Sequence, residues 1–326
     1  MNAFWLLCAT LCLGVFFISS VAGILLANAS AWTTWHFRSQ IQLLGFPGLL
    51  FAIRAFPLAF GAALTLGFAL PSFLLLEPKR SVEAPEPYLI LFAGLGLAGI
   101  IVIAARYVRL VARSRKTIKQ WLGSAQLLST SCPIPVYQIQ SPDSLIAVAG
   151  ILRPKVFVGR AALASVTPEE LNATIAHELA HVRSLDNFKQ LLLKITRLPD
   201  FFASLSRLEA AWSAATEVVA DANALREGIS PIELSSAIVK VGRLKTFAND
   251  GLSVAACHLI PPDGGSSALA MRIQRLSDAL EIHPESAARE TSACWAVVLL
   301  IGAVAYLLVL PAALPVVHRW MEWFVQ

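Results

Sequence analysis

The chain has 326 residues, of which 56% are hydrophobic and 14% are charged, whereas soluble domains average about 45–50% apolar and about 25% charged residues. This composition excludes both an ordinary soluble domain and an intrinsically disordered chain. The net charge of +5 is compatible with nucleic acid or with an anionic membrane surface as a partner. The charges are concentrated in residues 106–290, which carry 38 of the 47 charged side chains, so the rest of the chain lies in a different solvent.

Four uncharged runs in the charge-poor parts are each long enough to cross a bilayer as a helix, because about 20 apolar residues span about 30 Å of hydrocarbon. We therefore predict four transmembrane helices, near 4–27, 55–76, 87–105 and 293–314. The first run could instead be a cleaved signal peptide, but no Lys or Arg precedes it, which favours an uncleaved anchor. The segment 39–53 is short and contains Pro47, which favours an interfacial or re-entrant helix.

Lys and Arg residues near the spans set the orientation of a membrane protein. Eleven of them flank the spans on the side of residues 106–290 and three on the other side, so we expect residues 106–290 to be cytosolic and both termini to lie outside. The predicted parts are a membrane domain (1–105), a cytosolic domain (106–290), and a fourth helix with a short tail (291–326). This is a multi-pass protein of the cell (inner) membrane.

The cytosolic part opens with a basic helical segment, 106–128, whose six Lys and Arg residues favour contact with anionic lipid headgroups. No platform of interleaved aromatic residues accompanies them, so we expect no direct binding of nucleic acid. Period-two alternation and β-rich runs then predict three strands in a small antiparallel sheet, at 136–140, 145–149 and 155–158.

Helices follow the strands. Thr167-Pro168-Glu169-Glu170 is typical of a helix start with a capping box, and no Gly or Pro interrupts the chain before residue 195. We predict helices at 168–195, 201–227, 231–247 and 267–282, with a loop at 248–266. The fold class is a mainly α membrane protein with a cytosolic α+β domain.

The first of these helices contains the motif His177-Glu178-Leu179-Ala180-His181. Histidines at i and i+4 share one helical face, so both imidazoles can reach one Zn²⁺ while the Glu178 carboxylate can take a proton from water held by the metal. Two exposed histidines beside a glutamate are the alternative. By composition this motif is expected only about 0.005 times in a chain of this length, which favours the metal site.

A catalytic zinc site usually has three protein ligands. Glu217 is the candidate third ligand, and Asp221, one turn later, can support a ligand histidine. A lone E-x-x-x-D pattern usually marks a solvated helix face, but here apolar neighbours such as Val218 and Val219 favour a buried site. Among the other histidines, His258 is a weaker candidate as a donor to the transition state. The cysteines form no C-x-x-C pair, which indicates neither a disulfide framework nor a cysteine zinc site.

Several segments together resemble the BlaR/MecR-type integral-membrane metallopeptidases. They are the H-E-L-A-H helix, the preceding segments 150–156 and 167–171, Asp186-Asn187, the E-x-x-A-D helix and Arg272-Ile273. The arrangement of three spans before the domain and one after it is also similar. The resemblance implies a zincin-like gluzincin with His177, His181 and Glu217 as zinc ligands and Glu178 as the catalytic acid and base. It also implies a transcriptional repressor, or the protease itself, as substrate.

Only about a dozen residues follow the last predicted span, so we expect the C-terminal penicillin-binding sensor domain of the β-lactam-sensing members to be missing. CAAX-prenyl-protease and heat-shock membrane proteases share both motifs. In the heat-shock type, spans lie between the two motifs, and residues 182–216 are too charged to form one.

The sequence therefore predicts a membrane-anchored zinc endopeptidase whose partners are the lipid bilayer and a cytosolic or membrane-associated protein. We expect the substrate to add as a strand to the sheet at 145–158. A quality-control protease of membrane proteins and a non-catalytic zinc-binding signalling scaffold are the alternatives, and the oligomeric state stays open.

Overall fold

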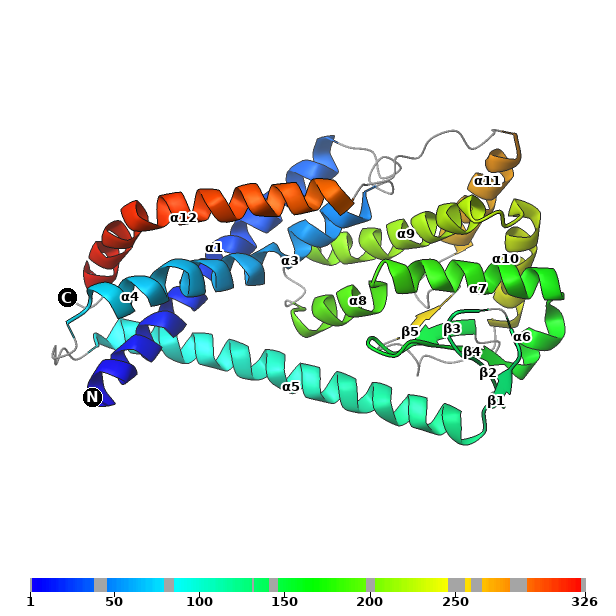
Figure 1. Ribbon diagram of the computed structural model, residues 1–326, viewed down its shortest axis with the longest axis horizontal. Helices are drawn as coiled ribbons and strands as arrows, with labels where there is room; N and C mark the ends of the chain where they lie inside the picture. The colour runs from blue at the N-terminus through cyan, green and yellow to red at the C-terminus, as the bar shows by residue number, and fades with distance from the viewer. Residues whose placement is uncertain are drawn as a thin grey trace. The chain divides into compact units, whose positions relative to one another are not determined.

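The computed structural model describes residues 2–37, 46–78, 85–130, 132–140, 146–197, 203–245, 256–258, 266–281 and 292–323 (Figure 1). The chain forms two compact units. The first comprises Met1–Thr33, Ile53–Ala104 and Ser286–Gln326, and the second comprises Thr34–Ala52 and Ala105–Glu285. Each unit is described separately below.

The first unit is built from long apolar helices. They are α1 (Asn2–Phe37), α3 (Pro47–Leu64), the π-helical turn η1 (Thr65–Ala69), α4 (Leu70–Leu76), the first part of α5 (Pro87–Gly123), and α12 (Ser292–Trp323). Within the described residues, three helical stretches are long and apolar enough to cross a membrane: Ala3–His36, Pro47–Leu76 and Pro87–Gly123. The first three predicted spans thus lie on helices of the required length, whereas the crossing by α12 stays a prediction.

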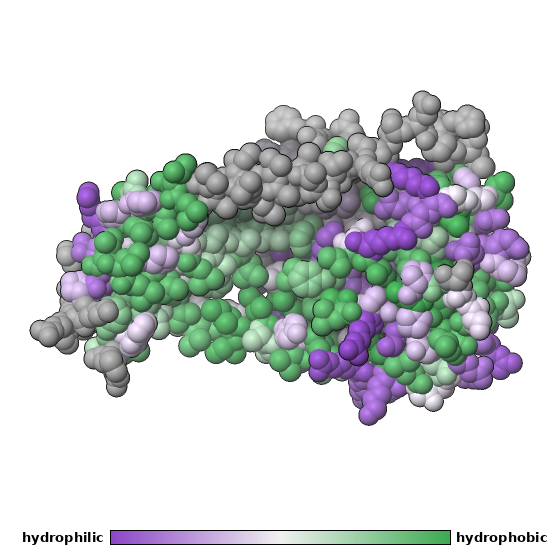
Figure 2. All heavy atoms as spheres, in the orientation of Figure 1, coloured by the Kyte–Doolittle hydropathy of each residue, from purple (hydrophilic) through white to green (hydrophobic). Residues whose placement is uncertain are grey.

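Exposed leucines and isoleucines line the outer faces of these helices, and Figure 2 shows hydrophobic residues gathered on their surface. The separate short helix expected at 39–53 is not formed in the described part of that segment. Residues 47–53 are instead the first turns of α3, which continues into the second span. Pro47 begins this helix because its fixed φ and missing N–H suit the first helical position. Residues 38–45 lie outside the described residues.

Glycines allow the helices of this unit to approach closely. A Cβ placed on Gly96 of α5 would lie 2.5 Å from the carbonyl oxygen of Leu13 on α1. Backbone atoms cannot retreat as the end of a flexible side chain can, so this contact requires glycine. Small residues at such crossings are typical of helices packed in membranes.

We expect Gly96→Ala to destabilise the helical unit by about 1–3 kcal/mol, the usual effect of an added group in a well-packed interior. The measurement is the thermal unfolding midpoint of the detergent-solubilised protein. Gly94→Ala is the matched control, since a Cβ on Gly94 of the same helix meets no atom within 4 Å. Equal midpoints for the two variants would contradict the close contact.

The second unit contains a five-stranded sheet formed by β1 (Gln126–Leu128), β2 (Val136–Ile139), β3 (Ile146–Ala149), β4 (Lys155–Gly159) and β5 (Ala256–His258). The strand order is β1-β2-β4-β3-β5. β3 and β4 form an antiparallel hairpin whose turn includes Gly150 at a φ of 101°, a conformation that favours glycine.

The prediction of a purely antiparallel sheet is wrong, because β2 pairs with β4 in parallel, with Val136 opposite Val156. β4 pairs with β3 on one side and with β2 on the other. β3 runs antiparallel to β4, whereas β2 runs in the same direction as β4. Alternation in the sequence marks strands but not their partners.

The predicted loop at 248–266 also contains a strand that the sequence did not indicate. β5 pairs antiparallel with β3, with Cys257 opposite Val148. Within the described residues, β3 therefore has a partner on both sides, β4 and β5. A substrate strand can pair with β3 only where it takes the place of β5.

The helices of this unit are α6 (Arg160–Ser165), α7 (Pro168–Arg183), α8 (Asp186–Ile195), α9 (Ala203–Arg226), α10 (Pro231–Lys245) and α11 (Ser266–Glu281). The basic segment continues from the third span as a helix, as predicted, but only to Gly123, where α5 ends. Residues 126–128, which were expected to be helical too, form β1 and pair with β2. The predicted capping box is present: Thr167 Oγ1 accepts the Glu170 N–H, and Glu170 Oε2 accepts the Thr167 N–H. Leu179 of α7 belongs to the same buried hydrophobic cluster as Val148 of β3 and Ile238 of α10.

The single helix predicted at 168–195 is wrong, because α7 ends at Arg183 and α8 begins at Asp186. Leu185 between them adopts a left-handed conformation with a φ of 55°. Neither Gly nor Pro marks this break. A contact between His181 at the end of α7 and Asp186 at the start of α8 favours it instead, with 2.8 Å between His181 Nδ1 and Asp186 Oδ2.

Candidate metal centre

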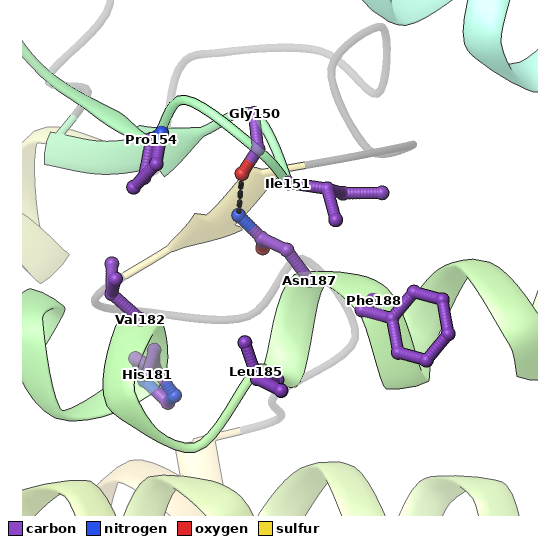
Figure 3. A pocket seen from close by; sticks show the side chains of 8 residues that line it. All are labelled: Gly150, Ile151, Pro154, His181, Val182, Leu185, Asn187 and Phe188. Carbon is purple, nitrogen blue, oxygen red and sulfur yellow. Dashed lines mark hydrogen bonds between the residues drawn. The ribbon is translucent and has the colours of Figure 1, made fainter.

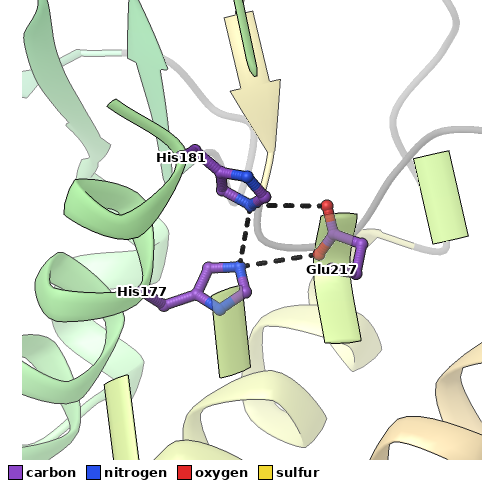
Figure 4. Close-up of side chains that lie close together, drawn as sticks. All are labelled: His177, His181 and Glu217. Atoms are coloured by element: carbon purple, nitrogen blue, oxygen red, sulfur yellow. Dashed lines mark hydrogen bonds and ion pairs between the residues drawn. The ribbon is translucent and has the colours of Figure 1, made fainter. Parts of the chain in front are cut away.

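The two histidines of the motif lie on one face of α7 and point at Glu217 of α9 (Figure 4). All three side chains are buried. The Nε2 atoms of His177 and His181 are 3.2 Å apart. His177 Nε2 is 3.5 Å from Glu217 Oε2, and His181 Nε2 is 3.5 Å from Glu217 Oε1. The structure thus brings together the three residues predicted as metal ligands.

These distances fit a tetrahedral zinc site. Zn–N and Zn–O bonds of about 2.0–2.2 Å at tetrahedral angles put neighbouring ligand atoms about 3.3–3.5 Å apart. The two histidine nitrogens are 3.2 Å apart, and each lies 3.5 Å from a different oxygen of the Glu217 carboxylate, so the separations lie close to that range. Two imidazoles and one carboxylate are also a common zinc donor set. The residues present therefore fit a zinc ion held by His177, His181 and Glu217.

Each histidine has a carboxylate at its other ring nitrogen. His177 Nδ1 is 2.9 Å from Asp221 Oδ1, and His181 Nδ1 is 2.8 Å from Asp186 Oδ2. A carboxylate that accepts the Nδ1 proton fixes the tautomer and turns the Nε2 lone pair toward a metal. Asp221 lies where the sequence predicted it. Asp186 had no predicted role, because the helix break that carries it back to His181 has no sequence signal.

A buried arginine from α11 completes the charge balance. Arg272 donates through Nε to Asp221 Oδ2 at 2.8 Å and through Nη2 to Asp221 Oδ1 at 2.7 Å. Its Nη1 is 2.8 Å from Glu217 Oε2. Burial opposes ionisation of both carboxyls, but the charge of Arg272 and the contacts with His177 together outweigh it and lower the pKa of each below its usual range. In the sequence, Arg272 contributes only to the family resemblance and has no predicted role.

Glu178 lies within the same helix turn and is fully buried. Its Oε2 accepts a hydrogen bond of 3.1 Å from the backbone N–H of Val148 in β3. Its Oε1 has no hydrogen-bond partner within the described part of the chain. Burial raises the pKa of Glu178 to about 7, against the lowering effect of His181 and His177. A carboxylate with a pKa near neutrality can both accept and return a proton.

The other candidate histidine, His258, belongs to β5, where its backbone lies opposite Ala147 of β3. Its side chain lies outside what the structure describes, so its role as a donor to the transition state stays a prediction.

The protonation of His177 leads to a test of metal binding. Burial disfavours the imidazolium, but hydrogen bonds to Asp221 and Glu217 raise the pKa of His177 to about 9 in the metal-free protein. Zinc requires a neutral imidazole, so each zinc bound displaces one proton below this pH. We expect the apparent zinc affinity to fall about tenfold per unit as the pH decreases from about 9 to about 7. Chelator competition across this range is the measurement.

Asp221→Asn is the matched variant, because it removes the carboxylate that stabilises the imidazolium. In this variant we expect the loss of zinc affinity to begin at a lower pH than in the wild-type protein, because the pKa of His177 falls when Asp221 loses its charge. A zinc affinity that does not change with pH in the wild-type protein would contradict the proton displacement.

A pair of histidines on one helix, a glutamate from the next long helix and a buried glutamate beside them define a metallopeptidase centre. Comparison with protein families agrees with this class: the family model of peptidase family M48 matches residues 112–291. The chain belongs to peptidase family M48, whose members are metal-dependent. No curated protein matches the chain. The match confirms a metallopeptidase family, and the narrower resemblance to the BlaR/MecR type stays a prediction.

Proposed function

We propose that this protein is a zinc-dependent endopeptidase anchored in the cell (inner) membrane by four helices, with its catalytic domain in the cytosol. The observation that carries the proposal is the convergence of His177, His181 and Glu217 at distances that fit tetrahedral zinc, with the Glu178 carboxyl buried in the same helix turn. Bound zinc supplies a Lewis acid that polarises the scissile carbonyl and activates a water molecule for attack.

The side chains around that centre transfer protons and orient the metal ligands. Glu178 takes a proton from the attacking water and delivers one to the leaving amine, the two transfers of a general base and acid. The Val148 N–H holds the Glu178 carboxyl in place. Asp221 and Asp186 orient the two imidazoles, and Arg272 keeps Glu217 and Asp221 ionised.

The membrane anchoring rests on the three helices that are long and apolar enough to span a bilayer, with α12 as the fourth. The excess of Lys and Arg on one side of the spans supports the cytosolic orientation.

For the substrate, we propose a cytosolic or membrane-associated protein cut during regulated signalling, either a transcriptional repressor or the protease itself. The resemblance to BlaR/MecR-type peptidases supports this choice. A non-catalytic scaffold is less well supported, because structural zinc sites usually have four protein ligands and need no buried glutamate beside the metal. The described residues bring three ligands together here.

The test uses the full chain purified in detergent. We expect about one zinc per chain, cleavage of a candidate repressor, loss of cleavage after chelation and its return when zinc is added. A protein that holds zinc but cleaves neither that repressor, nor itself, nor an unfolded protein such as casein would overturn the proposal. Proteomics of a deletion strain separates one stabilised repressor from the many stabilised membrane proteins expected of a quality-control protease.

A further inference from the structure

A small pocket lies directly beside the candidate metal centre, with His181 forming part of its wall (Figure 3). The pocket lies between the turn that joins β3 to β4 and the start of α8. It is small and partly open to solvent, with a volume of about 20 Å³. Most of its lining is apolar: Ile151, Pro154, Val182, Leu185 and Phe188. A chain bound at the metal can therefore lay a neighbouring side chain over this apolar lining.

Asn187 holds the two sides of the pocket together. Its Nδ2 donates to the carbonyl oxygens of Val148 and Gly150, at 3.3 and 3.1 Å (Figure 3 shows the second bond). These bonds tie α8 to the end of β3 and to the turn after it. The backbone on both sides of the pocket is thus held in place, and the apolar side chains form the surface that a ligand can contact.

Two of the lining residues leave large apolar side chains exposed to solvent. Leu185 is 58% exposed and Phe188 is 44% exposed. Leu185 also adopts a left-handed φ of 55°, a strained conformation for leucine that glycine would adopt freely. Strained residues are concentrated at functional sites, and exposed apolar side chains beside a catalytic centre are typical of a surface that a ligand covers.

The pairing of β5 with β3 shows how an extended segment lies along this edge of the sheet. It runs antiparallel, with Ala256 opposite Ala149 and His258 opposite Ala147. A substrate that takes the place of β5 in the same orientation has its amino-terminal side toward Gly150 and the pocket. Val148 contacts Glu178 and Gly150 lies two residues further on, about 7 Å at 3.3 Å per residue.

We propose that a large apolar side chain of the substrate, such as Leu, Ile, Met or Phe, packs against the exposed apolar wall of this pocket, on the amino side of the scissile bond and within about three residues of it. Leu185 and Phe188 are its specificity-determining residues. This inference rests on the proposed peptidase function, and it names the substrate feature that the site selects.

The test is cleavage-site profiling of the zinc-loaded full chain on a library of proteome-derived peptides, read by mass spectrometry. In the wild-type protein we expect large apolar residues to be enriched at one position on the amino side, with Leu preferred over Ala there by about tenfold or more. In Leu185→Gly we expect this preference to fall by about tenfold. The backbone at residue 185 suits glycine, so this variant is expected to fold and to keep the zinc content of the wild type.

Leu152→Ala is the matched control, since Leu152 is a 94% exposed leucine of the same turn that does not line the pocket. We expect the profile of this control to equal that of the wild type. Phe188→Ser serves as a second variant and is expected to weaken the same preference.

Cleavage by the wild-type protein with no apolar preference on the amino side, or a preference that survives both Leu185→Gly and Phe188→Ser, would overturn this inference and leave the proposed function intact. If the zinc-loaded wild type cleaves no peptide at all, the proposed function fails and this inference fails with it.

Discussion

Glu178→Gln is expected to lower kcat/KM for peptide hydrolysis by about 10²–10⁴-fold, the usual contribution of a general acid and base. The amide has nearly the shape of the carboxyl, so it can keep its place beside Val148 in β3, but it cannot take a proton from water. Glu178 is outside the ligand trio of His177, His181 and Glu217, so we expect the zinc content to stay unchanged. The measurements are initial rates and zinc per chain on the same preparations.

Glu169→Gln is the matched control, because Glu169 is an exposed glutamate at the start of the same helix. We expect this control to keep the rate of the wild type. Equal cleavage by wild type and Glu178→Gln would refute the role of Glu178. Equal zinc content with no activity in either protein would favour the scaffold that the sequence left as an alternative.

Arg272→Gln is expected to destabilise the metal-free protein by about 3–5 kcal/mol, because Glu217 and Asp221 then lose the buried guanidinium that pairs with both of them. For a domain of about 150–250 residues, a change of 1 kcal/mol shifts the unfolding midpoint by about 2–4 °C, so we expect a decrease of about 6–20 °C. The thermal unfolding midpoint in detergent, followed by tryptophan fluorescence, is the measurement.

The effect of Arg272→Gln should depend on pH. Arg272 holds the pKa values of Glu217 and Asp221 below their usual range, so the stability it contributes is present above the ordinary carboxyl pKa and is lost as the pH falls through the lowered values. The difference between the two proteins should therefore be large near pH 7 and smaller in acid. Arg275→Gln removes the same charge from a partly exposed position on α11 and is expected to change the midpoint little. Equal midpoints for the two variants would contradict the buried ion pairs.

The features that the sequence predicted well depend on residues that are close together in the chain. The capping box of α7 lies within four consecutive residues, and the i, i+4 spacing of His177 and His181 puts both on one face of any helix that contains them. Glu217 was found because apolar neighbours surround it on a helix with a clear end. For the same reason, the basic continuation of α5 beyond the third span could be predicted from composition and the absence of Pro.

What the sequence did not predict depends on tertiary contacts. No Gly or Pro in the sequence marks the helix break at Leu185, which adopts a left-handed conformation. The break brings Asp186 back to His181, and the contact between these two side chains stabilises it. The parallel pairing of β2 with β4 depends on which edge the hairpin leaves free. In the sequence, Arg272 cannot be distinguished from other basic residues of an amphipathic helix. Only the packing of α11 beside α9 buries it against Asp221.

The separation of Arg272 from its partners has a consequence for protein synthesis. Arg272 follows Asp221 by 51 residues in the chain. At about 5–20 residues per second, a ribosome adds that stretch in about 3–10 s. For that time a nascent chain already carries both histidines, Glu178 and Glu217 but has no guanidinium to neutralise the acidic side of the centre. The order of translation thus delays completion of the centre until most of the peptidase domain has been made.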